Sequence, residues 1–211
     1  MSEETIRSCI DCGTESCNFM DGKFPPFCLT THMDEAVLQE AMNLYTEDEE
    51  NYKVATVSAE VETDYYCQAT RIQETVEFAR RMGYKKIGIA NCLGLLREAR
   101  VAAQIFRNAG FEVYGVGCKV GAQPKETIGI PEKCKATGVN MCNPILQAKL
   151  LNAQKTELNV LIGLCVGHDS MFYKYSDALV TTLVVKDRVL GHNPVAGLQL
   201  TNSYYRKLLD L

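Results

Sequence analysis

Short apolar runs alternate with longer amphipathic stretches through the second half of the chain. Each run is typical of a buried strand, and the stretches between them repeat their apolar residues at helical spacing. The predicted strands are residues 86–91, 111–117, 158–164 and 178–185, and the predicted helices are residues 95–109 and 144–154. Strands that alternate with helices form parallel sheets through crossover connections. The pattern predicts an α/β, Rossmann-like three-layer domain with a mostly parallel sheet of about four or five strands.

The pattern before residue 86 is less regular. The sequence Thr31-x-x-Asp34 resembles a helix-capping signal, and the apolar residues after it predict a helix. The acidic run 47–50 is interpreted as a solvated linker. Residues 53–83 fit both a helical and a strand repeat, and two helices are favoured there, the second from about Cys67 to Met82.

The C-terminal part of the chain carries two further predictions. Residues 186–190 follow the last predicted strand and indicate a hairpin at the edge of the sheet. Residues 197–211 indicate a helix that closes one face of the sheet.

The first thirty residues contain four cysteines and two adjacent prolines, with little periodic hydrophobicity. Such a segment cannot build its own core, and a bound metal is the usual means of ordering it. We therefore expect two parts, a cysteine-rich segment at residues 1–32 that binds metal or an iron–sulfur cluster, and an α/β domain at residues 33–211 with a cysteine-lined crevice.

Composition limits the classes of function. No basic stretch followed by a hydrophobic one begins the chain, and no apolar run approaches the roughly 18 residues that cross a bilayer, so we expect a soluble cytoplasmic protein without a membrane partner. The net charge of −4 argues against a nucleic-acid partner. In a reducing compartment thiols stay reduced, so ten cysteines in 211 residues indicate a metal or redox protein rather than a disulfide scaffold.

Four cysteines are grouped near the N-terminus with the spacing C-x2-C-x4-C-x10-C. They are Cys9, Cys12, Cys17 and Cys28. Four thiolates suit either a tetrahedral zinc ion or a [4Fe-4S] cluster. Zinc ribbons more often use two CxxC pairs, so the two single cysteines favour iron and sulfur. A structural zinc knuckle remains the alternative, with His32 as a possible replacement ligand.

Three other cysteines, Cys92, Cys118 and Cys165, each follow a predicted strand. Ligands of open parallel sheets bind at the carboxyl ends of the strands, where helix N-termini also stabilise thiolates. One buried cysteine would be an ordinary small apolar residue. Because all three occupy strand ends, we expect them to line one crevice.

Two further cysteines belong to a long connection, residues 119–141, and to the helix start that ends it. Loops of this length inside a compact domain are usually functional or disordered. Asn143 can cap the next helix with Pro144 at its first position, which holds Cys142 beside the same crevice. Cys134 and Cys142 could thus add a fourth and a fifth thiolate. A soft, sulfur-rich donor set suggests an iron–sulfur cluster, with zinc second.

His168 and Asp169 are the candidate catalytic residues. They follow the third strand end in a glycine-bounded loop, where His168 could donate a proton, contact a cluster sulfur or act as a ligand. Equally, Asp169 could cap a short helix while His168 bonds a loop carbonyl. His192, before Asn193-Pro194, fits a turn better than catalysis. Lys186 or Arg188 could bind an anionic substrate if the hairpin tip folds over the site.

The chain resembles a family catalogued as "domain of unknown function 1847", whose members look like metal-binding proteins of anaerobic bacteria and archaea. The segments that carry the resemblance are Cys9-Ile10-Asp11-Cys12-Gly13, Met141-Cys142-Asn143-Pro144, Gly163-Leu164-Cys165-Val166-Gly167-His168-Asp169-Ser170 and Lys186-Asp187-Arg188-Val189-Leu190-Gly191-His192-Asn193-Pro194. The resemblance implies an anaerobic source, oxygen-sensitive chemistry and intact cysteine positions, and it supplies no activity. Cys67 is not a position associated with the family and is left out of the ligand set.

The expected function is that of an iron–sulfur protein of anaerobic metabolism, with a first cluster at the N-terminus that feeds a second at the sheet edge. It would act as a redox or electron-transfer module or as a small reductive enzyme, with a redox protein or a small molecule as its partner. One alternative is a zinc-binding structural or regulatory module. Another is a sulfur-transfer or desulfurising enzyme. The chain has no P-loop, no GxGxxG after a strand and no Gly-x-Ser-x-Gly elbow.

Overall fold

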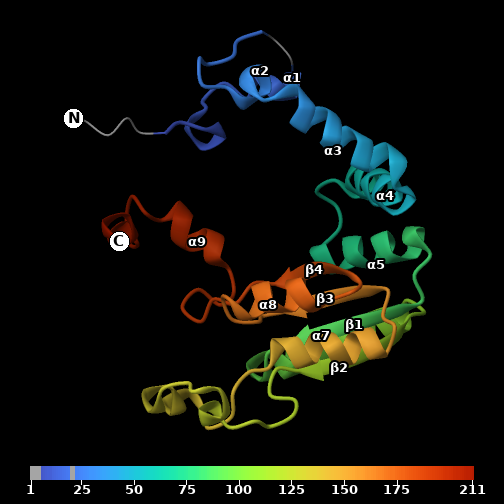
Figure 1. Cartoon of the computed structure of the whole chain (residues 1–211), viewed down its shortest axis with the longest axis vertical. Coiled ribbons are helices and arrows are strands. Elements are labelled where there is room, and N and C mark those ends of the chain that lie inside the picture. The colour runs from blue at the N-terminus through green and yellow to red at the C-terminus, as the bar shows by residue number, and fades with distance from the viewer. Residues whose placement is uncertain (1–5, 20–21) are drawn as a thin grey trace. The chain divides into compact units, whose positions relative to one another are not determined.

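The computed structural model of the protein describes residues 6–19 and 22–211 (Figure 1). The chain divides into two compact units, Met1–Thr56 and Val57–Leu211. The boundary falls inside helix α4 (Glu49–Tyr65). The predicted division near residue 32 rests on cysteine content rather than on packing, and it stays a prediction.

The first unit is helical in its described residues. Its elements are η1 (Cys9–Asp11), α1 (Ser16–Phe19), α2 (Leu29–His32), α3 (Glu35–Glu47) and the first part of α4. The predicted helix is present as α3, but its start differs from the prediction, because Thr31 lies in α2 and the N-cap is Asp34. The Asp34 side chain accepts a hydrogen bond from the backbone N–H of Ala36 at 2.9 Å.

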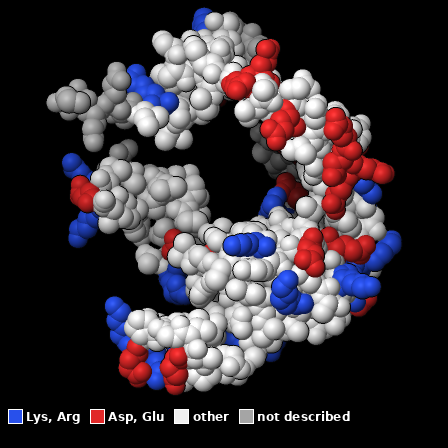
Figure 2. Space-filling view, in the orientation of Figure 1, with Lys and Arg blue, Asp and Glu red and all other residues white. Residues whose placement is uncertain are grey.

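The acidic run is not a linker, so that prediction is wrong. Glu47 ends α3, and α4 begins at Glu49 after a single intervening residue. That residue, Asp48, accepts a hydrogen bond from the N–H of Asn51 at 2.9 Å. Carboxylates in the first turn of a helix are stabilised by its exposed N–H groups. Figure 2 shows Asp and Glu side chains gathered along this pair of helices.

The second unit is built on a four-stranded sheet in the order β2-β1-β3-β4, and every neighbouring pair is parallel. The strands are β1 (Lys86–Asn91), β2 (Glu112–Gly117), β3 (Leu158–Ile162) and β4 (Leu179–Val184). The predicted Rossmann-like α/β fold is therefore confirmed. Asn91 is in register with Gly117 on one side and with Ile162 on the other, so these three strands end side by side.

Helices cover both faces of the sheet, which gives three layers. Helices α5 (Arg71–Met82) and α6 (Leu96–Asn108) form one apolar core with Ile87 and Ile89 of β1. Helices α7 (Pro144–Ala153) and α8 (His168–Tyr175) form the other with Ala90. Because successive strand residues point to opposite faces, one apolar strand contributes to both cores.

One face of β1 is packed too closely for any side chain at Gly88. A Cβ atom there would lie 2.0 Å from Oδ1 of Asn159 and 3.1 Å from the Leu151 side chain on α7. Asn159 is held in place, because its Oδ1 accepts from the Thr156 hydroxyl and its Nδ2 donates to Ser176 Oγ, both at 2.8 Å. The glycine therefore lets α7 approach the sheet.

Two helices do occupy residues 53–83, as predicted, but α5 begins at Arg71 rather than at Cys67. Thr70 is its N-cap, and its backbone N–H donates to Oε1 of Gln73 at 2.9 Å. None of the helices in residues 6–19 and 22–211 combines the length and apolar character needed to span a membrane.

The predicted edge hairpin is wrong. After β4 the chain turns at Asp187, whose Oδ1 accepts from the N–H groups of Val189 and Leu190 at 2.9 and 2.8 Å. The predicted helix at residues 197–211 is also wrong, since the chain forms α9 (Pro194–Gln199), a series of turns and η5 (Arg206–Asp210). Three more short 3-10 helices are η2 (Leu93–Leu95), η3 (Lys125–Ile128) and η4 (Glu132–Thr137).

Candidate functional site

The ends of β1 and β2 place Cys92 and Cys118 next to each other. The N–H of Cys118 donates to the carbonyl of Asn91 at 2.8 Å, and the N–H of Cys92 donates to the carbonyl of Ile162 at 3.0 Å. The hydrogen-bonded ladder thus continues one residue beyond each strand. Cys165 follows β3 after two intervening residues.

The start of α7 brings a third thiol to the same edge. The N–H of Asn143 donates to the carbonyl of Cys118 at 2.8 Å, and Oδ1 of Asn143 accepts from the N–H of Leu146 at 3.0 Å. Asn143 is therefore the N-cap, and Pro144 is the first residue of the helix, as predicted. This arrangement sets Sγ of Cys142 3.9 Å from Sγ of Cys118.

A buried glutamine fixes α7 against the strand ends. The Gln147 side chain is fully buried, and its Nε2 donates to the carbonyls of Asn91 at 3.3 Å and Val116 at 2.6 Å. Its Oε1 has no hydrogen-bond partner in the described part of the chain. One side chain therefore holds the start of α7 against both β1 and β2.

The three adjacent thiols do not share protons equally. Hydrogen bonds to Cys142 and Cys92, together with burial, raise the pKa of Cys118. Hydrogen bonding with Cys118 lowers the pKa of Cys142 to about 4 and that of Cys92 to about 5. The N–H of Leu93 also donates to Sγ of Cys118 at 3.4 Å. These shifts favour a protonated Cys118 between the thiolates of Cys92 and Cys142 in this row of three cysteines.

Cations lie beside the outer thiolates. His168 is the first residue of α8, and its side chain hydrogen-bonds with Cys142. This contact raises the pKa of His168 and contributes to the low pKa of Cys142. Lys186 hydrogen-bonds with Cys92, and its positive charge contributes to the low pKa of Cys92. A nearby cation stabilises the charged form of a thiol.

Arg188 holds the remaining thiol of the edge. Its Nη2 donates to Sγ of Cys165 at 3.0 Å, and this bond raises the pKa of the guanidinium. The charges of Cys92 and Cys142 raise it further, so Arg188 lies within electrostatic reach of three thiols. Sequence patterns assigned Arg188 to a hairpin tip; the turn at Asp187 instead directs it to the cysteines.

A glycine beside Lys186 makes room for Leu95. Gly163 has a positive φ of 61°, and a Cβ atom there would lie 2.1 Å from Cδ1 of Leu95 and 3.4 Å from Cε of Lys186. A Cβ at Gly94 would lie 3.8 Å from Sγ of Cys92 and 3.9 Å from Nζ of Lys186. Gly163 therefore lets Leu95 pack against the end of β3, and the Gly94 distances show that Lys186 and Cys92 lie near the same point of the backbone.

The two candidate catalytic residues have different surroundings. The backbone N–H of His168 donates to the carbonyl of Cys165 at 2.9 Å, and its side chain bonds the thiol of Cys142. Asp169 is in the first turn of α8, where its Oδ1 accepts from the N–H of Ser170 at 2.8 Å. The structure therefore brings His168 to the thiols, while Asp169 makes a local contact.

Cys134 lies in η4, within a segment organised by a buried lysine. Nζ of Lys125 donates to the carbonyl of Cys134 and to Oγ1 of Thr137, the latter at 3.0 Å. In residues 22–211, no hydrogen bond joins the Cys134 thiol to the other cysteines of the edge. Its place in the ligand set stays a prediction.

The N-terminal cysteines lie on short helical turns. Cys9 begins η1, Cys17 is in α1, and Cys28 is the N-cap of α2. Sγ of Cys12 lies 3.5 Å from Oγ1 of Thr14, and this hydrogen bond lowers the pKa of Cys12. Nδ1 of His32 lies 3.0 Å from the carbonyl oxygen of Cys28, so the imidazole is adjacent to this set.

Neither cysteine set is a finished coordination sphere. Throughout residues 6–19 and 22–211, no three His, Cys, Asp or Glu side chains are grouped so that they could hold a metal ion as they stand. All ten cysteines are free thiols, however, and thiolates are the donors that soft metals prefer. The donor chemistry therefore fits a metal or cluster, and loading would require side chains to rotate inward.

A cavity of about 520 Å³ adjoins the edge beside β4. Its walls include the buried Leu95 and the exposed Val185, together with His192. Nδ1 of His192 accepts from the N–H of Asp187 at 3.0 Å, so this histidine holds the turn together, as its sequence context indicated. The walls are mostly apolar and could accept part of a small molecule.

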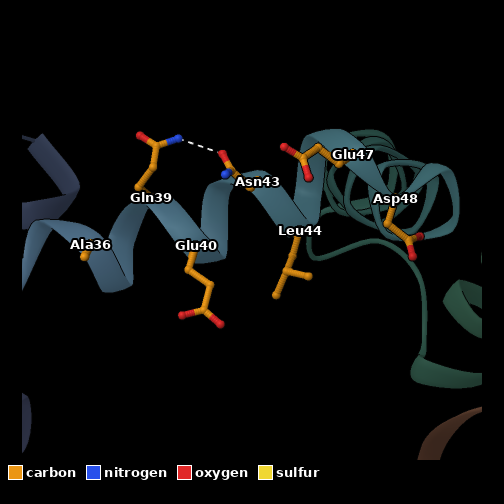
Figure 3. Close-up of a pocket in the computed structure, with 7 residues that line it drawn as sticks. All are labelled: Ala36, Gln39, Glu40, Asn43, Leu44, Glu47 and Asp48. Atoms are coloured by element: carbon orange, nitrogen blue, oxygen red, sulfur yellow. Dashed lines mark hydrogen bonds between the residues drawn. The ribbon is translucent and has the colours of Figure 1, made fainter.

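A second concave surface, of about 570 Å³, belongs to the first unit (Figure 3). Its lining residues are Ala36, Gln39, Glu40, Asn43, Leu44, Glu47 and Asp48. Figure 3 shows the hydrogen bond of 2.7 Å from Nε2 of Gln39 to Oδ1 of Asn43 on the same helix face. This surface contains no nucleophile and no thiol, so it is not the candidate site.

Comparisons with known proteins show the family to which the chain belongs. A family model described as "Protein of unknown function (DUF1847)" matches residues 28–183, which include every edge cysteine but not Arg188 or the first three cysteines. The chain is also similar to "Uncharacterized protein MJ0455" of Methanocaldococcus jannaschii, with 50% identity over 162 residues that cover 77% of this chain and 83% of that protein. The chain belongs to the DUF1847 family.

Proposed function

We propose that the carboxyl edge of the sheet is a thiolate centre that binds an iron–sulfur cluster, and that the protein acts as a redox module or a small reductive enzyme. The observation that carries the proposal is the row of Cys92, Cys118 and Cys142, three free thiols from three separate chain segments. A fourth thiol, Cys165, lies beside the row at Arg188. Four thiols at one sheet edge are an ample donor set for a cluster.

The charges around the thiols support an anionic occupant. A cluster bound by several thiolates carries net negative charge, which burial alone would disfavour. Lys186, Arg188 and His168 each contact a different thiol of the edge. These cations offset the negative charge of the thiolates, and they would do the same for a bound cluster.

The residues of the chain have distinct parts in this proposal. When bound, a cluster supplies electron transfer. Cys92, Cys142 and Cys165 would hold it as thiolates, and Cys165 would have to exchange its bond with Arg188 for a bond to iron. His168 would remain near the Cys142 sulfur, where its proton tunes the charge of the site. Cys118 is the most buried of the edge thiols and would supply the fourth ligand.

A structural or regulatory zinc ion is a second candidate, and one distance favours it. Two sulfurs about 2.3 Å from the same tetrahedral ion lie about 3.8 Å apart. Sγ of Cys118 and Sγ of Cys142 are 3.9 Å apart, so this pair already has the spacing of two ligands of a single ion. Metal analysis separates the two candidates directly.

The proposal extends to the N-terminal set as a separate centre. This set would bind either a second cluster or zinc through Cys9, Cys12, Cys17 and Cys28. His32 is a neighbouring donor that could replace one of these cysteines as a ligand. The short turns that carry these cysteines bury Ser16 and little else. A metal would therefore contribute directly to the folding free energy of this segment.

The test is anaerobic purification followed by visible absorption, iron, acid-labile sulfide and zinc analysis. Two [4Fe-4S] clusters would give a brown protein with about eight iron atoms and as many sulfides per chain. A colourless protein that holds zinc and no iron would overturn the cluster proposal.

Single variants separate the two centres. Cys165→Ser should remove about half of the iron through the edge site, and Cys12→Ser about half through the N-terminal site. Cys67→Ser is the matched control, because Cys67 is an exposed thiol that belongs to neither set, and it should leave the iron content unchanged. Loss of all iron on replacing Cys165 alone would contradict two independent sites.

A further inference from the structure

We propose that Cys142 and Cys118 form a reversible disulfide when the edge centre is empty, and that this bond blocks metal loading. The second part rests on the proposed function, whereas the first depends only on the geometry of the two cysteines. The bond would be a covalent modification site with peroxide-class oxidants as its reagents.

A backbone hydrogen bond holds the two cysteine-bearing segments together. The N–H of Asn143, the residue after Cys142, donates to the carbonyl of Cys118 at 2.8 Å. Disulfides require Cα atoms about 4.4–6.8 Å apart, and segments joined directly by a backbone hydrogen bond can meet this requirement.

The sulfur atoms are already in contact. Their separation of 3.9 Å must shorten to about 2.05 Å when the bond forms, as the Cys142 side chain moves toward Cys118. Sγ of Cys118 is held from the other side by the N–H of Leu93 at 3.4 Å. One sulfur is therefore fixed, and the other approaches it.

The two thiols differ in solvent exposure, and this difference determines which of them reacts with the oxidant first. Cys142 is partly exposed, while Cys118 is only 3% exposed. A small oxidant thus meets Cys142 first, and Cys118 reacts from inside the protein. This division resembles that between a sensing cysteine and its resolving neighbour.

The chemistry balances with hydrogen peroxide as the oxidant. The thiolate sulfur of Cys142 attacks one peroxide oxygen, the O–O bond breaks, and Cys142 sulfenic acid and hydroxide are formed. The hydroxide takes a proton from the solvent and becomes the first water. The sulfur of Cys118 then attacks the Cys142 sulfur, the S–O bond breaks, and the hydroxyl leaves with the Cys118 proton as a second water. Two thiols lose two electrons, peroxide gains two, and a dithiol reductant reverses the change.

The other edge thiols have different neighbours. Cys165 is bonded by Arg188 at 3.0 Å, and Cys92 by Lys186. Cys92 also flanks Cys118 and is the competing partner for it. Closure of the Cys118–Cys142 bond would remove two of the four donors at the edge and leave too few thiolates for a cluster.

Peptide mapping tests the pairing without any variant. Trypsin places the edge cysteines on separate peptides, residues 87–97 for Cys92, 108–119 for Cys118, 136–149 for Cys142 and 156–174 for Cys165. Metal-free, reduced protein is treated with hydrogen peroxide, quenched by alkylation, digested and analysed by mass spectrometry. We expect one cross-linked species that joins peptides 108–119 and 136–149, and its loss on reduction.

Two results would overturn the pairing. One is a cross-link between peptides 87–97 and 108–119 in place of the expected one. The other is Cys142 oxidised to sulfinic acid with no cross-link. In Cys118→Ala, a sulfenic acid should persist at Cys142 and react with dimedone, whereas Cys165→Ser, the matched control, should cross-link as the parent protein does.

Metal loading is then measured on the reduced and oxidised forms with iron and sulfide, and with zinc alone. The oxidised form should lose the edge-bound metal, and a dithiol reductant should restore it. Equal loading of both forms would overturn the blocking role. If the cross-link forms but the reduced protein binds no metal, the proposed function fails and the pairing stands. If the reduced protein binds metal and no cross-link forms, the pairing fails and the proposed function stands.

Discussion

Lowering the pH from about 8 to about 6 should leave the alkylation rate of Cys142 almost unchanged in the folded, metal-free protein, because its sulfur remains a thiolate. Contacts with Cys118 and His168 lower the pKa of Cys142 to about 4. A depressed pKa keeps the thiolate populated at every pH well above its value. The rate is therefore expected to fall only as the pH approaches the lowered pKa.

The size of the effect follows from the thiolate fractions. An ordinary thiol with a pKa of about 8.5 is about 24% thiolate at pH 8 and about 0.3% at pH 6, a change of about 75-fold. A thiol with a pKa of about 4 is still about 99% thiolate at pH 6. The folded and unfolded proteins should thus differ by nearly two orders of magnitude in their pH response.

The assay is a short pulse of iodoacetamide at each pH, followed by denaturation, digestion and quantification of peptide 136–149. The same peptide in guanidinium-unfolded protein is the matched control, because it has the same sequence without the surrounding thiols and cations. If the folded protein shows the same steep pH response as the unfolded protein, Cys142 is not a thiolate at neutral pH. Our account of proton sharing along the row would then be wrong.

Two further predictions concern the packing that supports the edge. Gly88→Ala should destabilise the fold by about 2 to 5 kcal/mol in denaturant titrations, since its Cβ would displace Asn159 and break its hydrogen bonds. Gly115→Ala, where the nearest atoms are 4.0 Å from the new Cβ, should cost far less, and an equal cost would refute the steric account. Gln147→Glu should cost about 3 to 5 kcal/mol at neutral pH, because it buries a carboxylate against two carbonyls. Burial raises the pKa of such a carboxyl, so part of the loss should be recovered as the pH falls. Gln147→Met loses the same two hydrogen bonds without adding a charge, so it should cost about 1 to 3 kcal/mol and show no such recovery.

The convergence of cysteines could be predicted because strand ends have a simple sequence signal. Cys92 and Cys118 directly follow apolar runs, and parallel strands in register must end together. Asn143-Pro144 predicted the start of α7, since its capping chemistry is local. The strand ends and the start of α7 could be predicted because each depends on interactions within one turn or one strand.

Features that depend on distant contacts were not predicted. The bond from Arg188 to Cys165 spans 23 residues and requires the turn that Asp187 makes with its own side chain. The pattern of Val189 and Leu190 suggested a strand, but the hydrogen bonds of Asp187 favour a turn there. The hydrogen bonds from the backbone to the Asp187 side chain therefore outweigh the tendency of the apolar residues to form a strand.

The long connection before α7 closes on itself. The N–H of Lys125 donates to the carbonyl of Val139 at 3.1 Å, and the N–H of Met141 donates to the carbonyl of Gln123 at 2.8 Å. These two hydrogen bonds join residues 123–125 to residues 139–141, next to the hydrogen bond from Asn143 to Cys118. A change in the length of the loop beyond these hydrogen bonds need not displace Cys118 or Cys142, whereas it would move Cys134, which lies in η4 within that loop.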